Sequence, residues 1–394
     1  MHTKHNFIMK KSILIALLAL FLMSCGSNNE RLLTSATGSI YECLVVSSPA
    51  VKEPVCSTMA GDMYGLPQME AYFTVSHVSP AQFDDFLKST RNILIIDIDE
   101  HKYTQVKTTH SRDSWSKPQA IVRIQAPSNE IFEEYWSTHG EVIRDWFVRE
   151  ELARQIRFYR ANTNKEAREI LNKQGYDLLI PEDYILIMDT ALCLNVPMVN
   201  DQMVNDQMVN DPYGEADRST GGRLEMVNDQ IVNDQMVNDK MVNVPMVNVL
   251  WCCNNKGPMR KDVFVYSYPY TSQEQFSNEA IIQMRDNIMG RLVSAQVEGS
   301  HMGTEFKHFP PVSRYVPALR DSIGGFYAVE TRGLWKIYDG EAMGGPFVSL
   351  TRLDQVNGRV VTAEGFLFAA GQKKRNAMRQ IEAILYTLRM PNER

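Results

Sequence analysis

The sequence predicts an α+β fold in which mixed, largely antiparallel sheets pack against amphipathic helices. Apolar and β-branched runs such as residues 92–98 indicate strands, and they alternate with segments whose apolar residues recur every three or four positions, as in residues 142–159. Turn dipeptides such as Asn357-Gly358 predict hairpins near the C-terminus. With 44% hydrophobic and 22% charged residues, the 394-residue chain can build a large core, which excludes a wholly disordered, collagen-like or multi-span membrane protein.

The N-terminal half should begin with strands and one intervening helix. The Ser79-Pro80 pair is a typical helix start, so we expect a helix over residues 81–90. Residues 92–98 form a continuous apolar run, which predicts a central strand buried on both faces. Further strands are expected over residues 41–46, 72–78 and 120–125.

Three helices should follow these strands. Ser128 begins the first, and apolar residues at three- and four-residue spacings predict a longer second helix over residues 142–159. The third helix covers residues 165–173 and ends at Gly175. The charged face of the second helix is expected to be solvated; its residues are Arg144, Arg149, Glu150, Arg154, Arg157 and Arg160.

The C-terminal half should contain antiparallel strands flanked by helices. We expect strands over residues 262–268, 327–337, 347–353 and 360–368, and helices over residues 277–289 and 372–389. The whole chain then divides into a signal peptide (1–24), a flexible tether (25–37), an N-terminal α/β half (38–192), a pentapeptide-repeat insertion (193–250) and a C-terminal α+β half (251–390).

The first 25 residues predict that the protein is located in the cell envelope. Met9-Lys10-Lys11-Ser12 is a basic start, and the apolar run that follows is shorter than the roughly 20 residues needed to span a bilayer, so it fits a secretory signal. Leu22-Met23-Ser24-Cys25 resembles a bacterial lipobox, which predicts that Cys25 carries a lipid anchor. Gly26 gives no inner-membrane retention signal, so we expect the outer membrane, with the leaflet side open. The alternative is an ordinary signal peptide with an incidental cysteine.

Five-residue units recur between residues 196 and 248, most of them ending in Met-Val-Asn. A five-residue period keeps no constant face on either a helix or a strand, so the array builds no continuous apolar stripe. We interpret it as a low-complexity loop expanded by tandem duplication. The alternative is an adhesive Met-Val surface segment.

Charge and cysteine content exclude several classes of protein. The net charge is −6, and removing residues 1–24 leaves 38 basic and 47 acidic residues, which disfavours binding to nucleic acid. The remaining cysteines contain no C-x-x-C pair, so neither a zinc site nor a redox site is expected; they are Cys43, Cys56, Cys193, Cys252 and Cys253. We therefore expect no metal and no cofactor.

Several segments together resemble an uncharacterised lipoprotein family of Bacteroidales-type bacteria, classed as a domain of unknown function. The resemblance covers roughly residues 38–192 and 251–390 and implies an envelope lipoprotein with no assigned activity. The chain departs from the family pattern at Leu350, where a polar residue is expected, and by carrying the repeat array. The resemblance rests on residues 92–99 (NILIIDID), 112–127 (RDSWSKPQAIVRIQAP), 264–270 (FVYSYPY), 331–335 (TRGLW), 343–354 (MGGPFVSLTRLD) and 373–388.

The best enzymatic candidate is the Asp97-Ile98-Asp99 sequence at the end of an apolar strand. It is similar to the nucleophile loop of haloacid-dehalogenase-type phosphatases, in which one Asp attacks phosphorus, the other acts as acid/base and magnesium bridges them. His101 stands where that loop usually has Thr or Val, and no later Lys and Asp-Asp set is visible. The alternative is two solvated carboxylates. His301, Glu305 and His308 could ligate a metal only on a helix, which the nearby glycines disfavour.

The candidate binding surface is formed by Arg332, Trp335 and Arg352 on neighbouring strands. Arg332 and Trp335 lie three residues apart and so on opposite faces, and Arg352 could join Arg332 to bind a carboxylate or a glycan-linked acid. The alternative is an arginine that bridges Glu330 or Asp354. Because no complete catalytic set is visible, we expect a lipid-anchored protein that binds an unknown envelope protein or a small ligand; a metal-dependent hydrolase at Asp97 and Asp99 is the other hypothesis.

Overall fold

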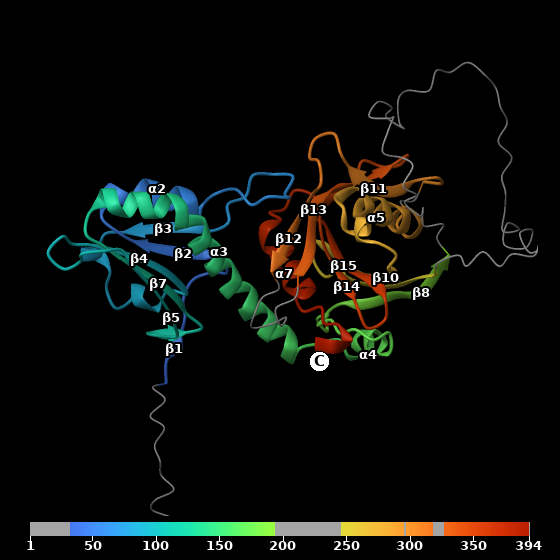
Figure 1. The fold of residues 1–394 in the computed structure, drawn as a ribbon, viewed down its shortest axis with the longest axis horizontal. Coiled ribbons are helices and arrows are strands. Elements are labelled where there is room, and N and C mark those ends of the chain that lie inside the picture. Colours follow the sequence, from blue (N-terminus) through green and yellow to red (C-terminus); the bar gives the residue numbers. More distant parts are fainter. Residues whose placement is uncertain (1–31, 194–245, 295–296, 318–326, 394) are drawn as a thin grey trace, which may run out of the picture.

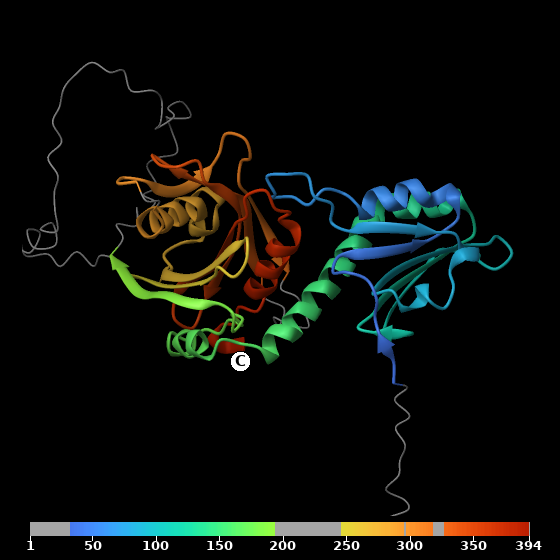
Figure 2. The same ribbon diagram turned by 180° about the vertical axis from the view of Figure 1, so that it is seen from behind.

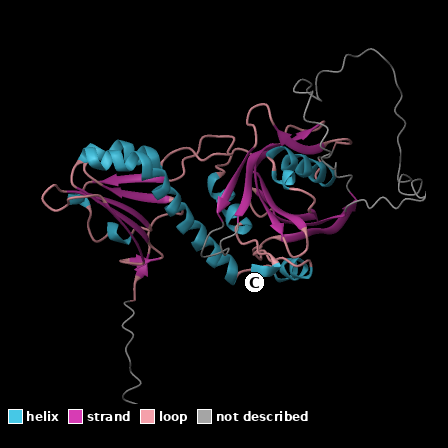
Figure 3. Cartoon of the chain, in the orientation of Figure 1, coloured by secondary structure: helices cyan, strands magenta, loops and turns pink. Residues whose placement is uncertain are grey.

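The computed structural model describes residues 32–193, 246–294, 297–317 and 327–393, which form two lobes joined by a long helix (Figures 1 and 2). The predicted signal peptide, Cys25 and most of the repeat array lie outside the described residues. The predicted α+β fold is confirmed: mostly antiparallel strands combine with helices throughout the chain (Figure 3).

The N-terminal lobe is a five-stranded sheet in the order β3-β2-β4-β7-β5. Four of its strands run parallel and only β5 is antiparallel, which distinguishes this sheet from the sheet of the other lobe. A small parallel pair, β1 and β6, lies beside it. The bounds are β1 Thr34–Ser35, β2 Glu42–Val46, β3 Thr74–Val78, β4 Asn92–Ile98, β5 Lys107–Arg112, β6 Ser116–Lys117 and β7 Ala120–Ala126.

Strand β4 lies at the centre of this sheet and is buried on both faces, as the continuous apolar run predicted. Leu94 and Ile96 face the core that contains helices α2 (Lys52–Met59) and α3 (Asn129–Ala161). Ile93 and Ile95 face a smaller cluster, closed by Phe83, Leu87 and Trp115. One strand therefore supports two separate apolar layers.

The predicted helix over residues 81–90 is wrong. The structure has two short 3-10 turns there, at Pro80–Gln82 and Leu87–Ser89. The Gln82 side chain accepts hydrogen bonds from the Ser79 backbone and hydroxyl, which completes the first turn, and Phe83 then leaves helical geometry with ψ 88°. Asp84 accepts the Leu87 N–H and begins the second turn. Local side-chain caps thus interrupt the helix.

The two helices expected between Ser128 and residue 159 are one continuous helix, α3. It passes through Gly140, where a Cβ atom would stand 2.8 Å from the Trp136 ring, so glycine gives the indole its room. The solvated charged face is also corrected, because Arg144, Glu150 and Arg154 are buried. Arg154 donates to Asn92 and Glu151, and Arg112 pairs with Glu150, so these charges attach the helix to the sheet.

The C-terminal lobe is built on an eight-stranded, strongly curved antiparallel sheet in the order β11-β13-β14-β15-β10-β9-β8 (Figure 1). The long strand β13 pairs with β12 along its first half and with β11 along its second. The predicted Asn357-Gly358 hairpin connects β14 to β15, with Gly358 at φ 59°. The bounds are β8 Ile185–Cys193, β9 Met246–Asn254, β10 Arg260–Pro269, β11 His301–Glu305, β12 Val312–Pro317, β13 Tyr327–Tyr338, β14 Gly344–Asp354 and β15 Arg359–Phe368.

Helices cover both faces of this curved sheet. Helix α5 (Asn278–Leu292) lies on the inner face over Phe264, Phe347 and Phe366. Helix α7 (Arg375–Leu385) lies on the outer face, and α4 (Lys165–Lys173) lies near the C-terminus (Figure 1). Predicted helix 165–173 is confirmed residue for residue, whereas the final helix is shorter than the predicted 372–389.

The predicted insertion 193–250 is too long at its C-terminal end. Strand β9 begins at Met246 inside the last repeat unit, and Val247 is fully buried and pairs with Leu192 of β8. Cys193 at the end of β8 pairs with Met246 at the start of β9, so the two ends of the inserted segment lie side by side. The array therefore joins two adjacent antiparallel strands.

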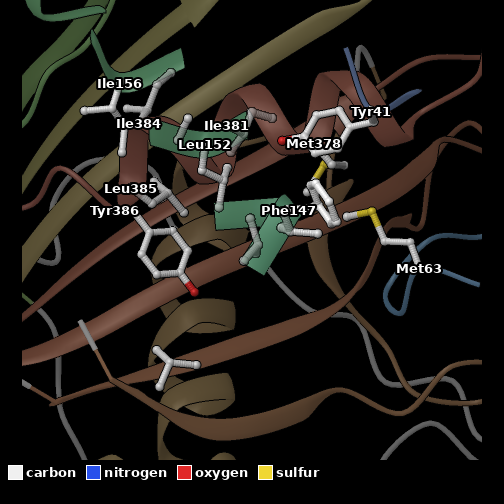
Figure 4. Close-up of a cluster of buried hydrophobic side chains, with 14 of the residues drawn as sticks. Tyr41, Met63, Phe147, Leu152, Ile156, Met378, Ile381, Ile384, Leu385 and Tyr386 are labelled. Carbon is white, nitrogen blue, oxygen red and sulfur yellow. The ribbon is translucent and has the colours of Figure 1, made fainter. Parts of the chain in front are cut away.

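The two lobes share one apolar core where α3 crosses α7. Figure 4 shows Phe147, Leu152 and Ile156 of α3 against Met378, Ile381 and Ile384 of α7, with Tyr41 and Met63 at one end. All of these side chains are buried. Continuous burial across the contact fixes the lobes to each other through an apolar interface.

Candidate functional site

A cleft of about 700 Å³ lies where the two lobes meet, and we call it the junction cleft. One wall is the face of α3 that carries Glu141, Arg144, Asp145, Val148, Arg149 and Leu152. The other wall is β12, and the floor is formed by β13 and α7. The loop between α2 and β3 reaches across from the N-terminal lobe to one side of the cleft (Figure 1).

The floor of the junction cleft is a buried network of ion pairs. Arg332 donates to both oxygens of Glu330 at 2.8 and 3.0 Å and to Glu382 at 2.6 Å. Arg379 donates to the second Glu382 oxygen at 2.6 Å. Tyr386 donates its hydroxyl to Glu330 at 2.6 Å. This network connects strand β13 to helix α7 with every carboxylate oxygen paired.

These partners keep the Glu330 carboxylate charged despite complete burial. Burial alone would raise its pKa, but the charge and hydrogen bonds of Arg332, the Arg314 guanidinium and the Tyr386 hydroxyl lower the pKa to about 2. Burial alone would lower the pKa of Arg332. The charges and hydrogen bonds of Glu330 and Glu382 outweigh burial and raise that pKa well above its usual value. The floor is therefore a permanent, self-neutralised set of charges.

The loop from the N-terminal lobe packs directly on this floor. Gly65, at φ 88°, lies so close to Arg332 that a Cβ atom would stand 3.2 Å from the Arg332 Cβ. The neighbouring Tyr64 ring lies 4.8 Å from that of Phe309, and its hydroxyl donates to the Pro310 carbonyl at 3.4 Å. A left-handed glycine here allows the close approach that joins the lobes.

Cations and aromatic rings remain available at the rim. The Arg314 side chain is 60% exposed although one edge pairs with Glu330. Arg149 is exposed, and its guanidinium has no hydrogen bond or ion pair within the described part of the chain. Arg144 stacks 4.1 Å from the Tyr72 ring and makes only long contacts, 3.3 to 3.4 Å, to Asp145 and Glu141.

Tyrosine rings lie beside these arginines. Tyr315 is 67% exposed and Tyr64 is 43% exposed, so both present ring surface to solvent at the cleft. An arginine fork suits a planar carboxylate, and a tyrosine ring offers a flat apolar face with a polar tip. These side chains form the rim of the cleft, whereas the floor carboxylates are saturated by arginine and are not placed to act as bases.

The structure brings only one of the three residues of the predicted binding surface to this cleft. Arg332 lies on the floor and bridges Glu330, which is the structural alternative stated above. Trp335 packs on the opposite face of the sheet and donates to the Leu367 carbonyl at 3.3 Å. Arg352 pairs with Glu393 at the other end of its strand. All three side chains are buried, so Arg332 does not face out while Trp335 packs in the core, and a shared binding surface of the three residues stays a prediction.

Asp97 and Asp99 lie at the carboxyl end of β4, as predicted, and each is engaged by a neighbour. Asp97 accepts the Tyr103 hydroxyl at 2.8 Å, and Asp99 pairs with Lys102 at 2.6 Å. The Lys102 ammonium lowers the pKa of Asp99. No group of three or more His, Cys, Asp or Glu side chains that could hold a metal ion occurs among the described residues. The phosphatase hypothesis stays a prediction.

The other metal-capable and thiol residues lie apart from the cleft walls. His308 contacts Glu305 at 3.1 Å, while His301 begins strand β11 and stacks on Tyr338. Cys43 is buried, as expected for a small hydrophobe, and all five described cysteines are free thiols. Burial raises the pKa of the Cys56 thiol, which disfavours its reactive thiolate form.

The two lobes match two separate family models. Residues 36–160 match a family described as a domain of unknown function (DUF8532), and residues 225–387 match another described as a domain of unknown function (DUF4837). These matches support an uncharacterised family and assign no activity. No curated protein matches the chain. Within the residues that the structure describes, no helix combines the length and apolar character needed to cross a bilayer.

Sequence reasoning missed the junction cleft because its parts are distant in the chain. Arg144 and Arg149 were visible as charges on the predicted helix, but their spacing alone is typical of a solvated face. Tyr64, Arg314 and Tyr315 lie in segments without periodicity or motif, and β12 itself was not predicted. The available signal was the pair Arg314-Tyr315, which combines two residue types that are enriched where proteins bind ligands.

Proposed function

We propose that this chain is a lipid-anchored protein of the cell envelope, held at the outer membrane through Cys25, that binds a ligand or partner without catalysing a reaction. The observation that carries the binding proposal is the junction cleft. Its floor charges are neutralised internally, whereas Arg149 and Arg314 at the rim have hydrogen-bonding capacity to spare beside Tyr64 and Tyr315. The lipid anchor rests on the basic start, the short apolar run and the Ser24-Cys25 junction.

The ligand best matched to the rim is a sugar that carries a carboxylate. A guanidinium can donate two parallel hydrogen bonds to a carboxylate, and this geometry adds specificity to the charge attraction. Exposed tyrosine rings can cover the flat face of a sugar while their hydroxyls hydrogen-bond to its polar edge. A cleft of about 700 Å³ falls within the range of clefts that bind small molecules.

Binding can be tested with a pair of disaccharides that differ in charge. Digalacturonic acid and neutral maltose would be titrated into the full chain in nonionic detergent, with binding followed by saturation-transfer NMR. We expect the acidic sugar to bind and Arg149→Gln to weaken it by about tenfold. Arg157→Gln makes the same charge change on an exposed part of the same helix outside the cleft and should have no effect. The proposal would be contradicted if maltose bound as tightly as digalacturonic acid. It would also be contradicted if Arg149→Gln and Arg157→Gln bound the acid equally well.

The anchor can be tested separately. Cys25→Ala should release the protein from the membrane fraction or leave the precursor uncleaved, because the acyl chains could no longer be attached; each buried methylene contributes about 0.8 kcal/mol to anchoring. Immunoblots of fractionated cells and the mass of the mature N-terminus provide the measurement. Unchanged membrane association with the signal removed at another position would refute the lipobox.

A further inference from the structure

A second, smaller cavity lies at the far end of the α3–α7 contact, where α3 ends near the C-terminal segment. Its volume is about 430 Å³, and we call it the terminal cavity. Ile156 and Arg160 reach it from α3, Arg168 and Asn172 from α4, and Arg389 from the segment after α7. Leu152 of the junction cleft and Ile156 of the terminal cavity are one helical turn apart and both packed against α7, so apolar side chains separate the two hollows.

Three arginines line the terminal cavity, and among the described residues only Arg168 forms an ion pair there. Arg168 donates to both oxygens of Asp177 at 2.9 and 2.7 Å. The second acid, Glu393, accepts hydrogen bonds from Arg352, which does not line the cavity, and from the Met390 backbone N–H at 3.1 Å. The guanidinium groups of Arg160 and Arg389 form no hydrogen bond or ion pair with any residue that the structure describes. Among the described residues, the Arg160 and Arg389 guanidinium groups therefore keep their hydrogen-bond donors, while the Glu393 and Asp177 carboxylates offset part of the Arg389 charge from a distance.

The backbone of Arg389 is held in place beside the cavity. Its backbone pairs with Asp177 in both directions, at 2.8 and 3.0 Å, which fixes its position against the loop after α4. Its side chain is half-buried, and burial lowers the pKa of the guanidinium. The charges of Arg352 and Arg160 also lower this pKa, whereas the carboxylates of Glu393 and Asp177 oppose the shift. Like charges held together in a partly desolvated hollow are unfavourable until an anion joins them.

We propose that the terminal cavity binds the phosphate group of a phosphate monoester. Two unpaired guanidinium groups match a dianion, whereas a carboxylate would neutralise only one of them. The volume admits a phosphate with a small attached group, and Asn172 adds an amide that can donate to a phosphate oxygen. The site is independent of the junction cleft and of the proposed function there.

The test uses the full chain in nonionic detergent, titrated calorimetrically with glycerol 3-phosphate at pH 8. We expect saturable binding that Arg160→Gln weakens by about tenfold and that Arg160→Gln with Arg389→Gln abolishes. Arg160 is exposed at the end of α3, so its single variant should fold normally, which thermal unfolding checks. Arg157→Gln, which changes the same charge one turn earlier and outside the cavity, should bind as the wild type does.

Three further arms identify the chemistry and its source. Lowering the pH to 5 should weaken binding, because a phosphate monoester loses its second charge near pH 6. Sodium acetate should not compete with glycerol 3-phosphate. The soluble lipid dihexanoyl phosphatidic acid carries the same group: binding of both phosphate compounds shows that the phosphate is recognised by itself, and binding of the lipid alone identifies a lipid headgroup as its source. Failure of both compounds to bind, or equal binding by the wild type and Arg160→Gln, would overturn the proposal.

Discussion

Two fully buried glutamates, Glu330 and Glu364, occupy opposite faces of the curved sheet, and their pKa values move in opposite directions. Glu330 faces α7 and accepts hydrogen bonds from Arg332, Arg314 and Tyr386, which lower its pKa to about 2. Glu364 faces α5 and receives one short hydrogen bond, 2.8 Å from Arg285, and a 3.5 Å contact from Tyr266. Burial dominates there, and the pKa of Glu364 is raised to about 7.

The comparison shows that burial by itself does not decide whether a carboxylate is charged. Both glutamates are at most 1% exposed, so desolvation acts strongly on each. The outcome depends on how many donors surround the oxygens and on which other charges lie nearby. Arg285 is shared with Asp286, whose negative charge further raises the pKa of Glu364. The cluster around Glu330, on the outer face, is therefore a saturated ion network. In the cluster around Glu364, on the inner face, the carboxylate has a pKa of about 7 and is only partly ionised at neutral pH.

The largest effect is expected from breaking the outer network. Arg332→Met should lower the free energy of unfolding by about 3–5 kcal/mol, because Glu330 and Glu382 would both lose a buried partner. Urea unfolding monitored by tryptophan fluorescence measures the change. Arg314→Met removes only an exposed partner of the same glutamate and should cost far less. Equal costs for the two variants would show that the buried network is not the stabilising element.

The matched change in the inner cluster should cost less. Arg285→Met should destabilise by about 1–3 kcal/mol, since Glu364 can take up a proton once its partner is gone. Methionine keeps much of the aliphatic contact that the Arg285 side chain makes 4.0 Å from the Phe347 ring. Urea unfolding at pH 6 gives the comparison with Arg332→Met. A greater loss for Arg285→Met than for Arg332→Met would reverse the ranking.

Stability should depend on pH in opposite ways for the two glutamates. The pKa of Glu330 is lowered on folding, so its contribution is present above its ordinary value of 4.5 and is lost as the pH falls toward 2. The pKa of Glu364 is raised, so the folded state binds its proton more tightly and stability falls as the pH rises from 4.5 to 7.

The Glu364→Gln variant isolates the contribution of Glu364 to the pH dependence of stability. It should be more stable relative to wild type at pH 7.5 than at pH 4.5, by on the order of 2–3 kcal/mol at about 1.4 kcal/mol per pKa unit. Glu330→Gln should instead destabilise at pH 7.5 and approach the wild type at low pH. Unfolding curves collected across this pH range provide the test. A Glu364→Gln effect independent of pH would contradict the raised pKa.

The smallest effect is expected from the repeat array, whose residues 196–245 lie outside the described structure. Deleting residues 196–245 leaves Leu194-Asn195 to connect β8 to β9, a two-residue hairpin loop between the paired Cys193 and Met246. The change in unfolding free energy should be below about 1 kcal/mol, since loop length acts only logarithmically.

A matched deletion sharpens this result. Extending the deletion to Asn248 also removes three residues of β9, including the buried Val247, and should destabilise the sheet measurably. Thermal unfolding of the two deletions gives the comparison. If the shorter deletion unfolded the protein, the array would be a structural part of the lobe and not an addition to it.

Strands and single helices followed from the sequence where one local pattern was strong. The apolar run 92–98 gave β4 without error, and Asn357-Gly358 marked the hairpin between β14 and β15. Prediction failed where patterns were weak or competing: β8 alternates exposed and half-buried residues and was not predicted, and side-chain caps divided the expected helix over residues 81–90. Of the residues that line the junction cleft, the sequence analysis singled out only Arg332 as a candidate binding residue. Its observed role is the alternative one, an ion pair with Glu330.

The sequence by itself determined the periodicities, and with them the mixed α+β class, the opposite facing of Arg332 and Trp335, and the acidic composition. These depend on residues near one another in the chain. Only the tertiary structure decided which charges meet, because Arg332 and Glu382 lie 50 residues apart and Arg285 and Glu364 lie 79 apart. The charge state of a buried carboxylate depends on donors that folding brings around it from distant segments, and local sequence carries no record of that arrangement.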